Sequence, residues 1–348
     1  MIQRAHGNAM SKSKAEIRIL FVYRGLSAFI NRDLNLLKRH FNVRGLGLRS
    51  YRRNPLILFK LIKGVLWADL IFSWFVDTNA FFIVLFSKIF RKKSVIVAGG
   101  SGIAFFPEIG YGALLNPIHA LKAKFALEHA DKILPFSKFA MEEVLSITRK
   151  ANMDMIPLAC DTERYKPGRG KEENIVLTVC IVTGSNIARK GLKTFLESAR
   201  LLPEIEFILI GRHKDDSVNY LRKMSPSNVE FTGYVSEKEL IRWYQRAKVY
   251  CQLSYQEGFG VAVIEAMACK CVPVVSSKAV VLRETVDDCG FYVPYGDAKA
   301  TTEAIKMALS ASVDLRAKAR KRVKDLFSIG KRGKKLLESI NKVVNARM

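Results

Sequence analysis

The sequence predicts an α/β protein made of two parallel-sheet domains that face each other across a cleft. At 348 residues, the chain is too long for one ordinary hydrophobic core and fits two. Its 49% hydrophobic and 26% charged residues are typical of a globular protein. In both halves, short apolar runs alternate with amphipathic segments, which is the pattern of parallel strands covered by helices on both faces.

The first half of the chain contains the more hydrophobic of these runs. We expect strands at 17–23, 68–75, 93–98, 130–137 and 153–159, with helices at 28–40, 79–90 and 138–150. The apolar stretch 70–90 is interrupted by Asp77, Asn79 and Lys88, so it indicates a buried strand and helix rather than a membrane span. Residues 1–16 are polar and basic, without the apolar segment of a signal peptide, and predict a frayed leader.

Proline, glycine and charge interrupt the pattern at 160–174, the predicted linker. Afterwards the alternation resumes and ends in a basic helical tail. The expected strands lie at 174–183, 205–211, 228–235, 248–254, 272–277 and 290–296, and the expected helices include 190–202 and 236–247. The predicted units are an N-terminal Rossmann-like domain (1–165), a C-terminal Rossmann-like domain (166–325) and a basic helix (326–348) that packs back on the N-terminal domain.

The formal net charge of +25 is unevenly distributed. No acidic residue occurs between Asp33 and Asp69, where the basic run Lys38–Lys63 alternates with apolar and aromatic side chains. This pattern suits an anionic membrane surface or a phosphorylated acceptor, and the same field would attract nucleic acid. The six cysteines form no C-x-x-C pair, so we expect buried thiols in a reducing cytosol.

Two glutamates flank a glycine turn in the segment "SYQEGFGVAVIEAMACKCVPVV". Glu257 precedes Gly258, Phe259 and Gly260, and Glu265 lies in the helix that we expect after the turn. Glycines let a phosphate approach the backbone, and a helix N-terminus favours an anion. A carboxylate accepts paired hydrogen bonds from neighbouring sugar or ribose hydroxyls. From the residues alone, an equally good interpretation is a turn-capping Glu257 and an ordinary helical Glu265.

A resemblance favours the sugar-binding interpretation. The segment "EGFGVAVIEAMACKCVPVVSS" resembles the E-x7-E signature of retaining GT-B glycosyltransferases, family 4 in particular. The segments "ADKILPFSKFAMEEV", "MIPLACDTERYKP", "ARKGLKTFLESARLLPEIEFILIG" and "VEFTGYVSEKEL" resemble other motifs of that family in the same order. The resemblance covers roughly residues 128–300 and is poor before Val95, where acceptors are recognised in that family.

The resemblance implies a set of site residues. Lys190 matches the lysine that contacts the donor diphosphate, Glu257 the glutamate that faces the transferred sugar, and Glu265 the one that binds ribose hydroxyls. The segment Gly258–Val261 (Gly258, Phe259, Gly260, Val261) matches the loop at the sugar and phosphate. Gly233 and Tyr234 match the base pocket.

The sequence also departs from the family. Many relatives have an arginine five residues before the lysine, where this chain has Ser185; Arg189 or Arg24, beside Gly25, are the expected substitutes. Lys270 occupies a position where glycine is common in that family, and we expect it only to shorten the end of the helix. The family's N-domain histidine has no match in "VAGGSGIAFFPEIGYG", and we expect His119 and His129 to be structural.

The implied activity is glycosyl transfer from a UDP- or GDP-sugar, with retention, to a glycan or lipid-linked acceptor near a membrane. Because the sequence contains no D-x-D pair, we expect no metal and no cofactor. Catalysis would rest on Lys190, Arg189 and Glu257. We expect a cytoplasmic protein, peripheral on the inner face of the membrane, that binds no nucleic acid. The open alternatives are a non-catalytic nucleotide- or anionic-lipid-binding protein, a nucleic-acid-binding protein and an epimerase of the same fold.

Overall fold

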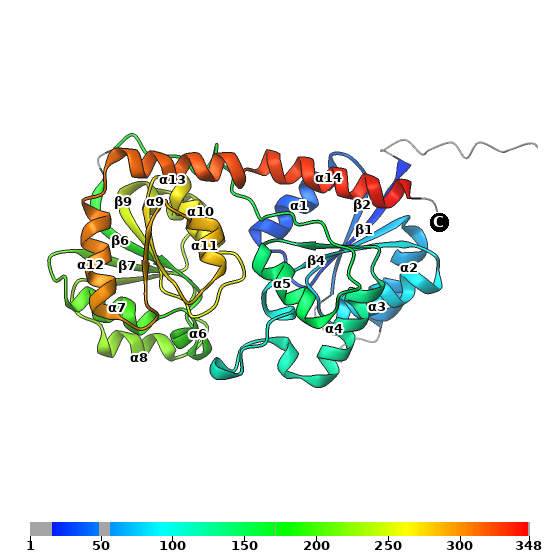
Figure 1. The fold of residues 1–348 in the computed structure, drawn as a ribbon, viewed down its shortest axis with the longest axis horizontal. Coiled ribbons are helices and arrows are strands. Elements are labelled where there is room, and N and C mark those ends of the chain that lie inside the picture. Colours follow the sequence, from blue (N-terminus) through cyan, green and yellow to red (C-terminus); the bar gives the residue numbers. More distant parts are fainter. Residues whose placement is uncertain (1–15, 49–55, 171, 347–348) are drawn as a thin grey trace, which may run out of the picture.

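The computed structural model describes residues 16–48, 56–170 and 172–346 and contains two α/β domains (Figure 1). Each domain has one sheet, in which every neighbouring pair of strands is parallel. The strand order is β2-β1-β3-β4-β5 in the N-terminal sheet and β11-β10-β9-β6-β7-β8 in the C-terminal sheet. Parallel sheets need helices on both faces, which explains why the apolar runs are nearly continuous. The predicted fold class is confirmed.

The N-terminal domain is built on a five-stranded sheet. Its strands are β1 (Arg18–Tyr23), β2 (Asn42–Gly47), β3 (Leu70–Trp74), β4 (Lys93–Ala98) and β5 (Lys132–Pro135). Its helices are α1 (Ala28–Lys38), α2 (Leu56–Trp67), α3 (Thr78–Ile89), α4 (Pro117–His129) and α5 (Lys138–Ile147), with short 3-10 turns at Gly100–Gly102, Pro107–Ile109 and Ala113–Leu115. The stretch 70–90 forms the fully buried strand β3 and helix α3, as predicted.

The C-terminal domain has six strands. They are β6 (Glu173–Val179), β7 (Glu206–Ile210), β8 (Val229–Gly233), β9 (Ala247–Gln252), β10 (Val272–Ser276) and β11 (Phe291–Val293). The helices are α6 (Gly184–Arg189), α7 (Leu192–Arg200), α8 (Ser217–Met224), α9 (Glu237–Arg246), α10 (Val261–Ala268), α11 (Val281–Val286), α12 (Ala298–Leu309), α13 (Val313–Leu326) and α14 (Ile329–Asn345).

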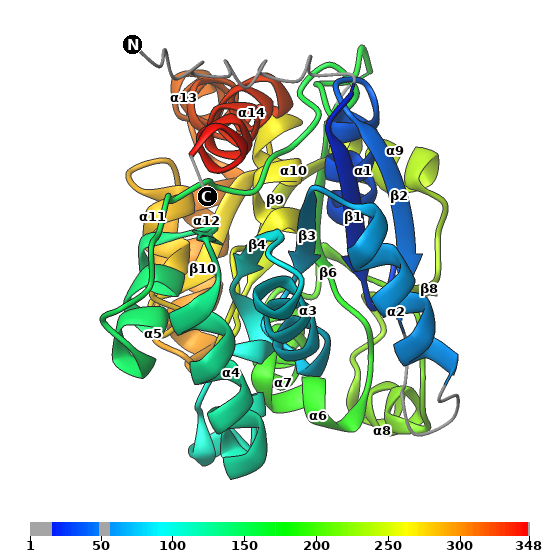
Figure 2. The ribbon, with the colours of Figure 1, turned by 90° about the vertical axis from the view of Figure 1, so that its right-hand side faces the viewer.

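The last two helices run across both domains, with α13 on the C-terminal domain and α14 beside α1 of the N-terminal domain (Figures 1 and 2). The α14 contact includes a buried ion pair, in which Arg332 donates to both oxygens of Asp33 at 2.8 and 2.6 Å. A second contact between the domains is aromatic: the Phe259 ring lies 6.2 Å from that of Phe136 and 5.5 Å from that of Phe327. Helix α14 and these rings join the two domains.

Several sequence expectations differ from the structure. The predicted strand 153–159 is wrong, because only Met153 makes an isolated bridge there. The expected helix at 190–202 forms as α7 but begins only at Leu192, because Gly191, with φ of 63°, is its N-cap; α6, which precedes it, was not predicted. The patterns did not predict β2, an edge strand with the mostly exposed sequence NVRGLG. They also did not predict α2, α4 and α11.

The structure describes only part of the basic run Lys38–Lys63, which the sequence predicts to face a membrane. Its residues Arg49, Arg52 and Arg53 lie outside the described residues, as do residues 1–15 of the predicted leader at 1–16. Among the residues that the structure describes, none of the helices is both long and apolar enough to cross a bilayer. All six cysteines are buried and free, as expected from their spacing.

Candidate functional site

The loop between β9 and α10 carries the glycine turn. Gly260 lies at the N-cap of α10 with φ of 89°, a left-handed conformation that side chains with a Cβ rarely adopt. Gly258 faces the N-terminal domain: a Cβ on it would lie 3.4 Å from the Cα of Gly100. The turn Gly258–Gly260 therefore leads into a helix N-terminus at the boundary between the domains, as the sequence predicts.

Glu257 lies at the centre of a buried hydrogen-bonded cluster. Its Oε1 accepts hydrogen bonds from Gln252 Nε2 at 2.7 Å and from Ser254 Oγ at 2.6 Å. The same oxygen forms an ion pair with Lys190 Nζ. Because Glu257 is only 7% exposed, the ion pair and hydrogen bonds replace its hydration. The structure therefore brings Lys190 and Glu257 into direct contact.

The charge state of Glu257 follows from two opposing effects. Burial by itself raises the pKa of this carboxyl, since it disfavours the charged form. The positive charges of Lys190 and Arg189, together with the hydrogen bonds from Lys190 and Ser254, outweigh burial and lower the pKa below its ordinary value. Glu257 is therefore a carboxylate at neutral pH, with Lys190 as its counter-ion.

Arg189 lies next to this cluster. Its guanidinium donates to Asn186 Oδ1 at 2.7 Å and to the carbonyl oxygen of Gln256 at 3.5 Å. The group also lies 4.8 Å from the centroid of the Tyr111 ring, which belongs to the N-terminal domain. Ser185 is exposed and contacts Thr183. Arg189, rather than Ser185, therefore supplies positive charge beside Lys190.

Glu265 belongs to a different cluster. It lies on α10, is 7% exposed, and its Oε1 accepts a hydrogen bond from Arg32 Nη2 of α1 at 3.4 Å. Arg32 also lies 5.8 Å from the centroid of the Tyr165 ring, and Tyr165 donates to Glu237 Oε1 at 3.1 Å. Burial raises the pKa of Glu265 to about 7, although Arg32 lowers it. Glu265 therefore titrates near neutral pH.

The two residues predicted at the base pocket lie at the end of β8. The carbonyl oxygen of Gly233 accepts a hydrogen bond from the backbone N–H of Gly211 at 2.9 Å. Tyr234 is 66% exposed, and the Arg212 guanidinium lies 4.3 Å from its ring centroid. The Arg212 guanidinium therefore covers one face of the exposed Tyr234 ring.

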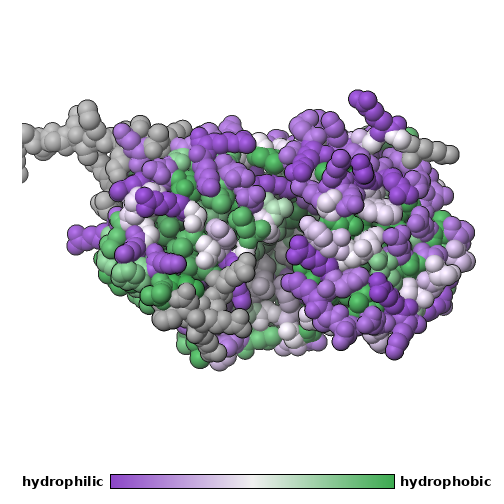
Figure 3. All heavy atoms as spheres, turned by 180° about the vertical axis from the view of Figure 1, so that it is seen from behind, coloured by the Kyte–Doolittle hydropathy of each residue, from purple (hydrophilic) through white to green (hydrophobic). Residues whose placement is uncertain are grey.

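Arg24 and Gly25 line a cavity of about 1370 Å³, mostly within the N-terminal domain. Two C-terminal residues, Arg212 and Lys214, complete its wall. Figure 3 shows the surface hollowed between the two domains. Lys190 and Glu257 are not among the residues that line this cavity, so Arg24 and Gly25 lie in a part of the cleft separate from that pair.

The two histidines in question have different surroundings. His129 contacts the Phe125 carbonyl oxygen through Nδ1 at 2.9 Å and stacks on the Phe125 ring, which is the structural role expected for it. His119 contacts the carbonyl oxygen of Gly102 through Nε2 at 2.9 Å and also lines the large cavity. Of these two histidines, only His119 therefore lies at the cleft.

Sequence reasoning did not identify the partners of the two glutamates. Tyr250, Gln252 and Ser254 alternate at the end of β9, and each contacts the next by a hydrogen bond of 2.7 or 2.8 Å. Their period of two before Glu257 was a usable signal. Arg32 carries no such signal, since it is one of many cations in the N-terminal half. Within the described part of the chain, no cluster of three or more His, Cys, Asp or Glu side chains could hold a metal ion.

The two facing parallel-sheet domains, with a glycine turn and a Lys190–Glu257 pair at their boundary, define the GT-B class of fold. Solved structures with this fold include Anabaena Alr3699/HepE in complex with UDP and glucose, with a TM-score of 0.77 and 17% identity over 94% of this chain and 100% of that one. The sucrose-phosphate synthase from Thermosynechococcus elongatus is also similar, with a TM-score of 0.77, 17% identity, and coverage of 95% and 100%.

Part of the chain is similar to a known family. Residues 161–326 match the model of the family described as glycosyl transferases group 1. The O-antigen chain mannosyltransferase B of Escherichia coli is 29% identical over 203 residues, which are 53% of this chain and 53% of that protein. The GDP-mannose:cellobiosyl-diphosphopolyprenol alpha-mannosyltransferase of Xanthomonas campestris is 23% identical over 295 residues, 81% of this chain and 75% of that one.

The chain spans 53%, 45% and 61% of the lengths of three curated relatives that it matches. The residues matched by the family model, 161–326, include Lys190, Glu257 and Glu265.

Proposed function

We propose that this chain is a retaining, metal-independent glycosyltransferase of family 4. It transfers a sugar from a UDP- or GDP-sugar to a lipid-linked or membrane-proximal glycan acceptor. The observation that carries the proposal is the buried Lys190–Glu257 pair beside the Gly258–Gly260 turn, within the part of the chain that matches glycosyl transferases group 1. The pair combines a cation for a diphosphate with a carboxylate for sugar hydroxyls.

The donor binds the C-terminal domain in this proposal. Lys190, Arg189 and the backbone amides of Gly258–Gly260 stabilise the negative charge that develops on the diphosphate as the bond to the anomeric carbon breaks. Glu257 accepts hydrogen bonds from the transferred sugar and Glu265 from the ribose. The acceptor oxygen bonds to the anomeric carbon on the face from which the diphosphate leaves, so the configuration is retained, and the leaving phosphate takes the proton of the acceptor hydroxyl, so no protein base is needed.

The proposed acceptor side is the N-terminal domain. Its helix α2 exposes Leu56 (64%), Phe59 (56%) and Leu66 (49%) next to Lys60 and Lys63. Figure 3 shows hydrophobic side chains gathered on this domain. Apolar side chains with neighbouring cations suit an anionic membrane surface, and we propose that the protein binds the inner face of the membrane. The named acceptor of the Xanthomonas campestris relative, cellobiosyl-diphosphopolyprenol, is of the lipid-linked class.

The test is a screen of UDP- and GDP-sugars for thermal stabilisation, since a ligand that binds only the folded state raises the melting temperature. The stabilising donor is then incubated with lipid-linked acceptors, and transfer is measured with and without EDTA. We expect an EDTA-insensitive product whose new bond has the anomeric configuration of the donor, by NMR. Stabilisation by a donor without any transfer would instead indicate the non-catalytic binding protein.

A further inference from the structure

The large cavity of the N-terminal domain is distinct from the donor loop. Its volume of about 1370 Å³ exceeds the 300–1,000 Å³ that is usual for small-ligand sites. The turn Gly100–Gly102 connects the two regions, because Ser101 and Gly102 line the cavity while Gly100 lies against Gly258. A molecule bound in the cavity would therefore end next to the proposed donor site.

The cavity wall is strongly positive. Arg24 and Lys122 come from the N-terminal domain, and Arg212 and Lys214 come from the loop after β7 of the C-terminal domain. Among the described residues that line the cavity, Asp77 is the only acid.

The carboxylate of Asp77 already accepts hydrogen bonds from the protein's own backbone. Asp77 Oδ1 accepts hydrogen bonds from the backbone N–H groups of Asn79 at 2.8 Å and Ala80 at 3.2 Å, which caps α3. The cavity is therefore lined by four cations and one carboxylate, and the hydrogen bonds of that carboxylate cap α3. A site for an uncharged sugar alone would offer hydroxyl acceptors rather than this excess of positive charge.

The cavity also has an apolar side. Phe29, Phe75 and Phe82 line it, together with Leu26, which is 49% exposed, and Ile118, which is 63% exposed. Cations and exposed apolar side chains in one cavity match a ligand that carries both a phosphate and a hydrocarbon chain.

We propose that this cavity binds the phosphate-bearing, hydrocarbon-linked end of the acceptor, with cations supplied by both domains. Arg212 and Lys214 are then specificity-determining residues for the acceptor, although they belong to the domain that holds the donor. The inference rests on the proposed function and narrows its acceptor to amphipathic phosphates.

The test measures binding of farnesyl diphosphate by calorimetry, which requires no transfer. We expect Arg212→Gln/Lys214→Gln to weaken binding by about tenfold or more, because charge-assisted hydrogen bonds are lost. Lys122→Gln should act in the same direction from the N-terminal side. The charge-matched control is Lys223→Gln/Lys238→Gln, whose residues are exposed on α8 and α9 and do not line the cavity. Melting temperatures verify that each variant is folded.

Three further outcomes decide the inference. Lys190→Gln should leave farnesyl diphosphate binding within about twofold, because Lys190 does not line the cavity. If Lys190→Gln weakens binding and the cavity variants do not, the probe occupies the donor site and the inference fails. Equal affinity for farnesol, or for inorganic pyrophosphate, overturns an amphipathic phosphate site. A protein that binds the probe as expected but transfers no sugar contradicts the proposed function and not the cavity assignment.

Discussion

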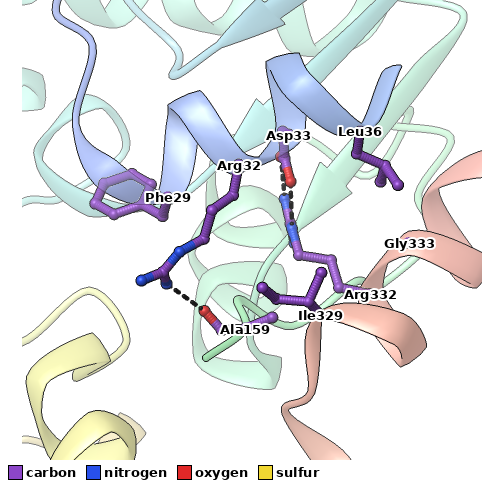
Figure 4. A pocket seen from close by; sticks show the side chains of 8 residues that line it. All are labelled: Phe29, Arg32, Asp33, Leu36, Ala159, Ile329, Arg332 and Gly333. Atoms are coloured by element: carbon purple, nitrogen blue, oxygen red, sulfur yellow. Dashed lines mark hydrogen bonds and ion pairs between the residues drawn. The ribbon is translucent and has the colours of Figure 1, made fainter. Parts of the chain in front are cut away.

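Arg32 of α1 donates a hydrogen bond across the domain boundary to Glu265 of α10, with 3.4 Å between Nη2 and Oε1. The same guanidinium donates to the carbonyl oxygen of Ala159 at 3.1 Å, and the next residue, Asp33, pairs with Arg332 of α14 (Figure 4). Two consecutive residues of α1 therefore hold α10 and α14. The carboxylate that we assign to the donor ribose is linked to the N-terminal domain before any donor binds.

This arrangement predicts a pH-dependent stability. The pKa of Glu265 is raised to about 7 in the folded protein, so between pH 4.5 and 7 the folded state binds more protons than the unfolded state. Stability therefore falls as the pH rises through this window, by about 3 kcal/mol for a shift of this size. Glu265→Gln should flatten the dependence, as measured by urea unfolding at pH 5, 6, 7 and 8.

A matched variant separates the charge of Arg32 from its packing. Arg32→Gln should extend the window to higher pH, because loss of the cation raises the pKa of Glu265 further. The slope that remains in Glu265→Gln should come partly from Glu143, whose pKa burial raises to about 8. An unchanged slope in Glu265→Gln would contradict a protonated Glu265 near neutral pH.

The Lys190–Glu257 pair predicts that substitutions can change stability and activity independently. Lys190→Ala should reduce kcat by about 100- to 1,000-fold, as for the loss of one donor to a developing anion. It should also destabilise the fold by about 3–5 kcal/mol, since Glu257 remains buried without its cation.

The double variant Lys190→Ala/Glu257→Gln tests this explanation. It should recover part of the stability, because no unpaired charge stays buried, and none of the activity. Steady-state kinetics and urea unfolding measure the two effects. Near-normal turnover in purified Lys190→Ala would remove Lys190 from the proposed reaction.

Glu284 makes a further connection between the domains. Its two oxygens accept hydrogen bonds from the backbone N–H groups of Lys138 and Phe139, each at 2.8 Å, so a C-terminal residue caps α5 of the N-terminal domain. Glu284→Ala should lower stability by about 1–2 kcal/mol and increase the radius of gyration by small-angle scattering. Glu303→Ala, at an exposed position of α12, is the control, and an equal change in both variants would contradict the connection.

Lys270 predicts a stabilising substitution. Its φ of 73° lies in the left-handed region, directly after the C-cap of α10, where glycine is preferred. Lys270→Gly should raise stability by about 0.5–1 kcal/mol, because relief of strain exceeds the entropy that glycine loses on folding. Lys299→Gly within α12 should do the opposite. A lower melting temperature for Lys270→Gly would show that this position is not strained.

The outcomes for particular residues show how far the sequence patterns extend. The buried strands were predictable because a parallel sheet covered on both faces requires continuous apolar runs such as Leu70–Trp74. The edge strand β2 was not, since its mostly exposed residues carry no apolar period. The donor loop was recognised because a glycine turn, a helix and two glutamates all lie within Ser254–Val275, directly after β9.

By itself, the sequence determined the two-domain α/β architecture and the glycine turn before α10. These features depend on residues that are close in the chain or on periodic burial, which local patterns record. Only the tertiary structure decided that Glu265 contacts Arg32, that Glu284 caps α5 and that Arg212 and Lys214 face an N-terminal cavity. These contacts join residues that are distant in the sequence, and the packing of the two domains, rather than any local pattern, brings them together.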